Sequence, residues 1–160
     1  MDAGLPAGEF TRVIREDPAR RGLLYCGTES GVWASLDDGR AWTRLRGNLP
    51  VAPIHDLIVK DGDLVVATHG RAFWILDDLA PVRQWSDSVV SKKAYLFAPQ
   101  AANHTVFPTR LGALRYFGGA NPPAGAVIDY WLSPSFGTAR PNPDEKKDDS
   151  PPWAKKSLRY

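Results

Sequence analysis

The sequence contains two copies of one pattern, forty residues apart. Residues 22–42 read GLLYCGTESGVWASLDDGRAW, and residues 62–78 read GDLVVATHGRAFWILDD. An alignment without a gap gives these pairs: Leu24 with Leu64, Thr28 with Thr68, Val32 with Ala72, Trp33 with Phe73, Leu36 with Leu76, Asp37 with Asp77, and Asp38 with Asp78. A period near forty residues is typical of propeller blades and of helical-pair repeats. The repeat therefore limits the chain to an architecture of similar units that stack on one another.

The apolar residues within each copy indicate strands and not helices. Two short runs rich in Val, Leu, Trp and Phe flank a polar turn at residues 29–31 in the first copy and 69–71 in the second. Short apolar runs around a tight polar turn predict a β-hairpin, and the 3.6-residue period of an amphipathic helix is missing. We therefore expect an all-β fold.

Around these hairpins, the sequence predicts two four-stranded antiparallel units within residues 9–85. The expected strands are residues 9–15, 23–28, 32–36 and 42–45 in the first unit, and 54–60, 64–68, 73–76 and 82–85 in the second. Four short strands in about forty residues agree with a propeller blade. A closed propeller normally needs at least four blades, so two blades predict a partial β-propeller.

The first copy also contains an Asp-box pattern, S-x-D-x-G-x-x-W, formed by Ser35, Asp37, Gly39 and Trp42. The Ser hydroxyl and the Asp carboxylate can bond to backbone groups of their own turn. Gly39 can adopt a positive φ without a Cβ clash, and Trp42 can anchor the next strand in the core. The second copy departs from the pattern, because it has Ile75 and Leu79 in place of the Ser and the Gly.

On these residues, the chain resembles the BNR or Asp-box repeat β-propellers, a superfamily that includes sialidase-like, xyloglucanase-like and sortilin-type propellers. The segments REDP, GLLYCGTE, SLDDGRAW and ATHGRAFWILDD carry the resemblance, which covers residues 9–85. Large bacterial secreted proteins described as glycosyl hydrolase or WD40/YVTN/BNR-like repeat proteins are the most similar. The resemblance implies a fragment of an extracellular or periplasmic parent protein, with any export signal upstream. It also implies that the remaining blades of the parent propeller are partners, with a protein or carbohydrate ligand.

The repeat pattern stops after Trp85, and three further segments follow. Residues 86–117 are expected to form an irregular linker, and residues 138–160, rich in Pro and charge, a disordered tail. Between them, residues 118–137 include an apolar strand at 126–132. In the proteins that the chain resembles, this pattern marks the first strands of an immunoglobulin-like sandwich.

Charge and composition exclude several classes of function. The chain has 20 basic and 18 acidic residues, mixed along its length, so it lacks the basic footprint of a nucleic-acid or membrane-surface protein. It has no apolar run long enough to span a membrane. The single cysteine, Cys26, cannot form an internal disulfide, and its place in an apolar strand indicates a packed core thiol.

Blade geometry ranks the polar residues as site candidates. In a four-stranded blade, the turn between strands two and three lies at the same end as the start of strand one. This end is expected to collect Glu29, His69, Arg71, His55 and Asp56 as ligand-face candidates. His69 and Arg71 are the most interesting of them, because a tight turn requires neither residue.

The opposite end is expected to hold the Asp-box turn, so Asp37 and Asp38 are interpreted as structural and not as an acid–base pair. Trp33 and Phe73 are interpreted as core residues. Sialidase chemistry requires three arginines, a Tyr–Glu pair and an acidic Asp, and two histidines are too few for a metal site. We expect no catalytic residue, metal or cofactor here. A non-catalytic binding or scaffold segment is the favoured function. The alternatives are a piece of a glycoside hydrolase with its catalytic residues elsewhere, and a sortilin-like protein-binding propeller.

Overall fold

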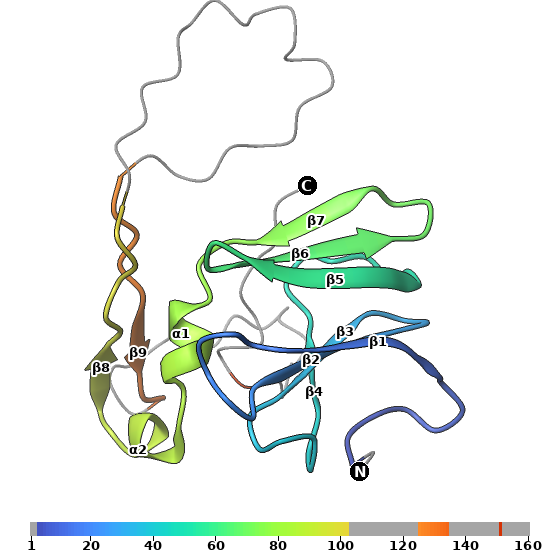
Figure 1. Ribbon diagram of the computed structural model, residues 1–160. Coiled ribbons are helices and arrows are strands. Elements are labelled where there is room, and N and C mark those ends of the chain that lie inside the picture. The colour runs from blue at the N-terminus through green and yellow to red at the C-terminus, as the bar shows by residue number, and fades with distance from the viewer. Residues whose placement is uncertain (1–2, 103–124, 135–150, 152–160) are drawn as a thin grey trace, which may run out of the picture.

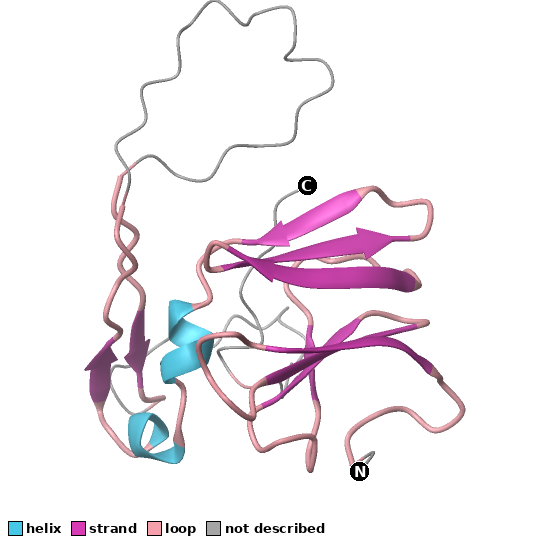
Figure 2. Ribbon diagram, viewed as in Figure 1, coloured by secondary structure: helices cyan, strands magenta, loops and turns pink. Residues whose placement is uncertain are grey.

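The computed structural model describes residues 3–102, 125–134 and 151 (Figure 1). Within them the chain is mostly strand with two short helices, as Figure 2 shows. The strands form antiparallel sheets of four, three and two strands, and none of the three closes on itself. The described chain is therefore mostly β, as the sequence predicts, and the partial β-propeller stays a prediction. The expected tail lies outside the described residues except for Pro151, as does the start of the expected immunoglobulin-like segment, residues 118–124.

The first sheet has the four strands that the sequence predicts, in the order β1-β2-β3-β4. Their bounds are β1 Thr11–Glu16, β2 Leu24–Thr28, β3 Val32–Ser35 and β4 Thr43–Leu45. Each strand pairs with the next through a turn or short connection, because an antiparallel meander needs no crossover.

The second sheet has only three strands, so the predicted fourth strand at residues 82–85 is wrong. The strands β5 Ile54–Lys60, β6 Asp63–Thr68 and β7 Phe73–Leu76 are followed by helix α1, Ala80–Gln84. Pro81 lies in the first turn of α1, where a residue without a backbone N–H is tolerated, whereas the same proline would interrupt a strand ladder. Burial of Leu79 and Val82 then fixes the helix against the core.

The segment expected to be an irregular linker contains helix α2, Asp87–Val90, and strand β8, Ala94–Leu96. Strand β8 pairs with β9, Tyr130–Leu132, which is the described part of the apolar strand predicted at residues 126–132. Trp131 packs against the main core, together with Phe97 just after β8. The immunoglobulin-like sandwich stays a prediction, since the described residues contain only this two-stranded ribbon.

The two copies of the repeat differ by one residue in the turn, so the alignment without a gap is wrong beyond it. The Thr28 N–H donates to the Gly31 carbonyl, whereas the Thr68 N–H donates to that of Ala72, one residue further along. In the ladders Leu24 faces Ser35, and Leu64 faces Leu76. The offset is therefore forty residues before the turn and forty-one after it.

This insertion corrects the expected equivalence of Trp33 and Phe73, because the counterpart of Trp33 is Trp74. Trp33 is 8% exposed and donates from Nε1 to the Thr28 hydroxyl. Trp74 packs against the core and donates from Nε1 to the Arg71 carbonyl. Phe73 is instead 66% exposed, so its interpretation as a core residue is wrong. By the same shift, the counterpart of Asp37 is Asp78 and not Asp77.

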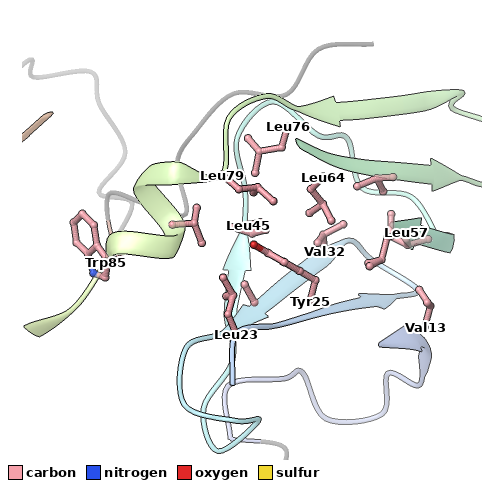
Figure 3. Packing of buried hydrophobic residues seen from close by; sticks show 14 of the residues in the cluster. Val13, Leu23, Tyr25, Val32, Leu45, Leu57, Leu64, Leu76, Leu79 and Trp85 are labelled. Atoms are coloured by element: carbon pink, nitrogen blue, oxygen red, sulfur yellow. The ribbon is translucent and has the colours of Figure 1, made fainter. Parts of the chain in front are cut away.

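The two larger sheets pack on each other through one apolar core, shown in Figure 3. The first sheet contributes a face that contains Tyr25, Val32 and Ala34, and the second contributes Leu64 and Val66. With the offset of forty, Leu64 and Val66 correspond to Leu24 and Cys26, which lie on the opposite face of the first sheet. Successive units are thus packed front to back and not through equivalent faces. Among the described residues, no helix is long and apolar enough to cross a bilayer.

Candidate functional site

The turns between the second and third strands of both units lie at the same end of the molecule (Figure 1). The register places Thr11, at the start of β1, opposite Thr28 before the first turn. It likewise places Ile54, at the start of β5, opposite Thr68 before the second turn. We call this end, with residues 11–15, 29–31, 54–56 and 69–72, the turn rim. It contains all five ligand-face candidates.

Two of the five candidates, Glu29 and Asp56, are held by arginines of β1. The Arg12 guanidinium lies 2.6 Å from Glu29 Oε1, and the Arg15 guanidinium lies 2.9 Å from Asp56 Oδ1. All four side chains are partly or largely exposed, so each ion pair contributes at most about 1 kcal/mol to stability. Their consequence is local, because both rim carboxylates are already neutralised by neighbouring arginines.

His55 and His69 form a stacked pair on the turn rim. Their ring centroids are 4.9 Å apart, and the ring planes differ by 19°. The backbone N–H of His69 donates to the Pro53 carbonyl at 2.8 Å, which holds the second turn beside the start of β5. The structure therefore brings together two histidines that the sequence separates by fourteen residues.

Arg71 projects from the same turn and is exposed. Its carbonyl accepts the Trp74 indole N–H at 2.7 Å, so the packed indole fixes the backbone of the turn. Among the described residues, the Arg71 guanidinium makes no hydrogen bond or ion pair. A planar guanidinium of this kind can bind a carboxylate through two parallel hydrogen bonds.

The turn rim carries three side chains that can donate hydrogen bonds, and two carboxylates that are paired with arginines. His55, His69 and Arg71 can donate to a ligand, whereas Glu29 and Asp56 are ion-paired. Glycoside hydrolysis needs one carboxylic acid and one free carboxylate across the scissile bond. Within residues 3–102 and 125–134, no group of three or more His, Cys, Asp or Glu side chains could hold a metal ion.

The Asp-box turn lies between β3 and β4, at the opposite end of the first sheet from the turn rim (Figure 1). The Ser35 hydroxyl donates to Asp37 Oδ1 at 2.7 Å and accepts the Gly39 N–H at 2.9 Å. Asp37 Oδ1 also accepts the Ala41 N–H at 2.9 Å. Gly39 has φ +82°, as its role in the turn requires.

These hydrogen bonds change the acidity of the box carboxylate. The Ala41 N–H, followed by the Ser35 hydroxyl, lowers the pKa of Asp37 below its usual value. Trp42 completes the turn by packing with Cys26 and Trp33 in a second cluster, and burial there raises the pKa of the Cys26 thiol to about 11. The groups of the Asp box are thus occupied in holding the turn.

A buried polar cluster around Asp17 is absent from the sequence-based candidates. The Asp17 carboxylate accepts the backbone N–H groups of Ala19 and Arg20 at 2.8 and 3.0 Å. It also lies 3.0 Å from Arg83 Nε, and the Tyr25 hydroxyl donates to it at 3.3 Å. Burial of the ring and the adjacent Asp17 charge raise the pKa of Tyr25 far above its usual value.

The same region fixes helix α1 to the first sheet. Arg20 Nη1 donates to the carbonyls of Val82, Arg83 and Trp85 at 2.9 to 3.0 Å, so it caps the C-terminal end of α1. The only sequence signal was the turn pair Asp17-Pro18. The partners of Asp17 and Arg20 on helix α1 and Trp85 lie more than sixty residues away, so local patterns could not identify them.

Comparisons with protein-family models, with curated proteins and with solved structures found no match for this chain.

Proposed function

We propose that this chain is a non-catalytic binding or scaffold segment of a larger, exported Asp-box repeat protein of the β-propeller type. The observation that carries the proposal is the front-to-back packing of two repeat units. Such packing leaves one unlike face at each end, so further units can be added in the same sense. A sandwich of two equivalent faces would offer no such continuation.

The hydrogen-bond donors on the turn rim support the proposal that the ligand is an anion. Arg71 follows His69 by two residues, and His55 stacks on His69. The rim carboxylates are occupied by Arg12 and Arg15. The ligand class favoured by these donors is a carboxylate on a saccharide or a peptide. In this chain the rim is exposed to water, and solvent weakens each charge–charge contact. We therefore expect binding at millimolar strength, about 4 kcal/mol.

A pair of oligosaccharides that differ by one carboxylate tests this assignment. In an NMR titration, sialyllactose is expected to shift the amide signals of the second turn, and its carboxamide, in which a neutral amide replaces the carboxylate, is expected to leave them unchanged. Arg71→Ala is expected to abolish the shifts. Arg21→Ala, which removes an exposed arginine from the turn between β1 and β2, serves as the matched control and is expected to retain them.

Enzyme activity is the second measurement. Aryl glycosides are expected to remain intact in the presence of the protein. Turnover that persists in the Arg71→Ala and His69→Ala variants would contradict both the non-catalytic assignment and the location of the site. Ligand-induced shifts confined to the Asp-box end would contradict the location alone.

A further inference from the structure

The second sheet has one apolar face that the described residues leave open. In its ladders, Ile58 pairs with Val65, Val65 with Ile75, and Ala67 with Phe73, so these five side chains lie on one face. We call this the open face. Phe73 is 66% exposed and Ile58 is 55% exposed, while Val65, Ala67 and Ile75 are half-buried. Large exposed apolar side chains gathered on one sheet face indicate a contact surface.

The repeat shows what kind of surface fits the open face. Across the corrected alignment, Val65, Phe73 and Ile75 correspond to Tyr25, Val32 and Ala34. In the first sheet these three residues are buried beneath the face of the second sheet that carries Leu64 and Val66. The packing of the second sheet on the first therefore shows, within one chain, the kind of contact that the open face lacks.

The complementary surface lies on the first sheet. The counterparts of Leu64, Val66 and Trp74 are Leu24, Cys26 and Trp33, which we call the capped face. In this structure Leu5 packs on the capped face together with Trp42. Leu5 thus occupies on the first sheet part of the position that a preceding unit would take, and we call residues 3–10 the N-terminal cap.

This N-terminal cap is attached at its start by backbone contacts of Ala3 and at its end by Glu9, whose pKa is lowered by hydrogen bonds from Ser30 and Thr28. Among the described residues, an isolated parallel bridge joins Ala3 to Ala41, with the Trp42 N–H donating to the Ala3 carbonyl at 2.8 Å. Gly4 has φ +95°, and a Cβ at this position would collide with the Trp42 carbonyl. A larger residue at position 4 would therefore force the cap away from the sheet.

We propose that two copies of this chain associate head to tail, with the open face of one against the capped face of the other after the cap has moved aside. The contact repeats the packing of the second sheet on the first within one chain. It is heterologous, so further copies extend it into a ring or an open chain. The contact uses the same two faces to which the proposed function assigns further units, so it applies where those faces are free, and it does not depend on any ligand on the turn rim.

Three full-length variants test the roles of the two faces by sedimentation velocity over a concentration series. Gly4→Val, which frees the capped face, is expected to associate at least about tenfold more tightly than the native chain. Adding Phe73→Glu to Gly4→Val is expected to return it to a monomer, because a charge in the contact would lose its hydration. Adding Leu96→Glu instead is the matched control, since Leu96 is 65% exposed on β8, away from both faces, and it is expected to preserve association.

A mixing experiment separates head-to-tail association from symmetric pairing. The Gly4→Val/Phe73→Glu double variant has a free capped face and a blocked open face, whereas the native chain has a usable open face. We expect the two proteins to form 1:1 complexes when mixed, although the double variant alone stays monomeric. Near-UV circular dichroism confirms that each variant retains its packed tryptophans.

Three results would overturn the proposal. The first is a Gly4→Val variant that keeps its native circular dichroism and stays monomeric at all concentrations. The second is association that Phe73→Glu leaves intact or that Leu96→Glu abolishes, because the contact would then lie elsewhere. The third is self-association of Gly4→Val without complexes in the mixture, which would indicate that two open faces pair with each other.

Discussion

The two repeat units share a plan and differ in how completely their surfaces are covered. The first unit has four strands, and both of its faces are packed, one on the second sheet and one under the N-terminal cap. The second unit has three strands, and the described residues pack on only one of its faces. The same repeat face is therefore buried in one unit and open in the other, so sequence similarity alone does not determine burial.

The missing fourth strand has an identifiable cause. Strand β4 of the first unit follows the complete Asp box, in which Ser35 and Gly39 shape the return of the chain. By the corrected alignment, the second unit has Leu76 and Ala80 at the positions of Ser35 and Gly39, and helix α1 begins at Ala80 with Pro81 in its first turn. The degenerate box thus redirects the chain toward the first sheet, where Arg20 and Asp17 bind the helix and its Arg83.

The largest effect on stability is expected from a comparison of the covered face of the first unit with the open face of the second. Trp42→Ala, in the covered second cluster of the first unit, should lower the free energy of unfolding by about 3 to 5 kcal/mol, because it opens a cavity against Cys26 and Trp33. Phe73→Ala, on the open face, should change it by less than about 0.5 kcal/mol. Urea unfolding of the two variants at low protein concentration measures both. Equal losses would show that the two faces are covered alike.

The second prediction compares the stability contributed by a buried ion pair with that contributed by an exposed one. Asp17→Ala should cost about 3 kcal/mol, since it leaves Arg83 and the Tyr25 hydroxyl without their shared acceptor in the interior. Arg15→Ala, which removes the exposed pair with Asp56, should cost at most about 1 kcal/mol. Thermal unfolding in low and high salt distinguishes them, because salt screens only the exposed pair appreciably. A small loss for Asp17→Ala would mean that helix α1 is held by apolar contacts alone.

The smallest effect concerns the Asp box itself. Because the folded-state pKa of Asp37 is lowered, its ionisation stabilises the fold above the unfolded pKa near 4, and this contribution is lost as the pH falls through the folded value. Asp37→Asn should therefore flatten the acid limb of the stability curve and reduce stability at pH 7 by at most about 1 kcal/mol, because solvent screens this exposed carboxylate. Asp38→Asn is the neighbouring control. Parallel acid limbs for the native protein and Asp37→Asn would refute the role of the carboxylate.

The end of the molecule at which the candidate residues lie could be predicted from the sequence, because neighbouring strands of an antiparallel sheet run in opposite directions. Once residues 24–28 and 32–35 are known to form a hairpin, the end at which Glu29 lies is fixed relative to Asp37. The pairing of Glu29 and Asp56 with arginines could not be anticipated. The Arg15–Asp56 pair depends on how closely β1 of the first sheet approaches β5 of the second, and the Arg12–Glu29 pair depends on the register that places the start of β1 opposite the end of β2.

The sequence by itself determined the class of the fold, the repeat, and the position of seven of the eight predicted blade strands. These are encoded in local apolar runs and turn residues, such as Gly39, whose conformational preferences act within a few residues. Tertiary structure alone decided which face of each sheet is buried, why Phe73 is exposed while Trp74 is packed, and that Asp17 binds Arg83. The physical reason is that a single residue inserted in a turn reverses the face on which every later side chain lies, and only packing between units selects the face to be buried.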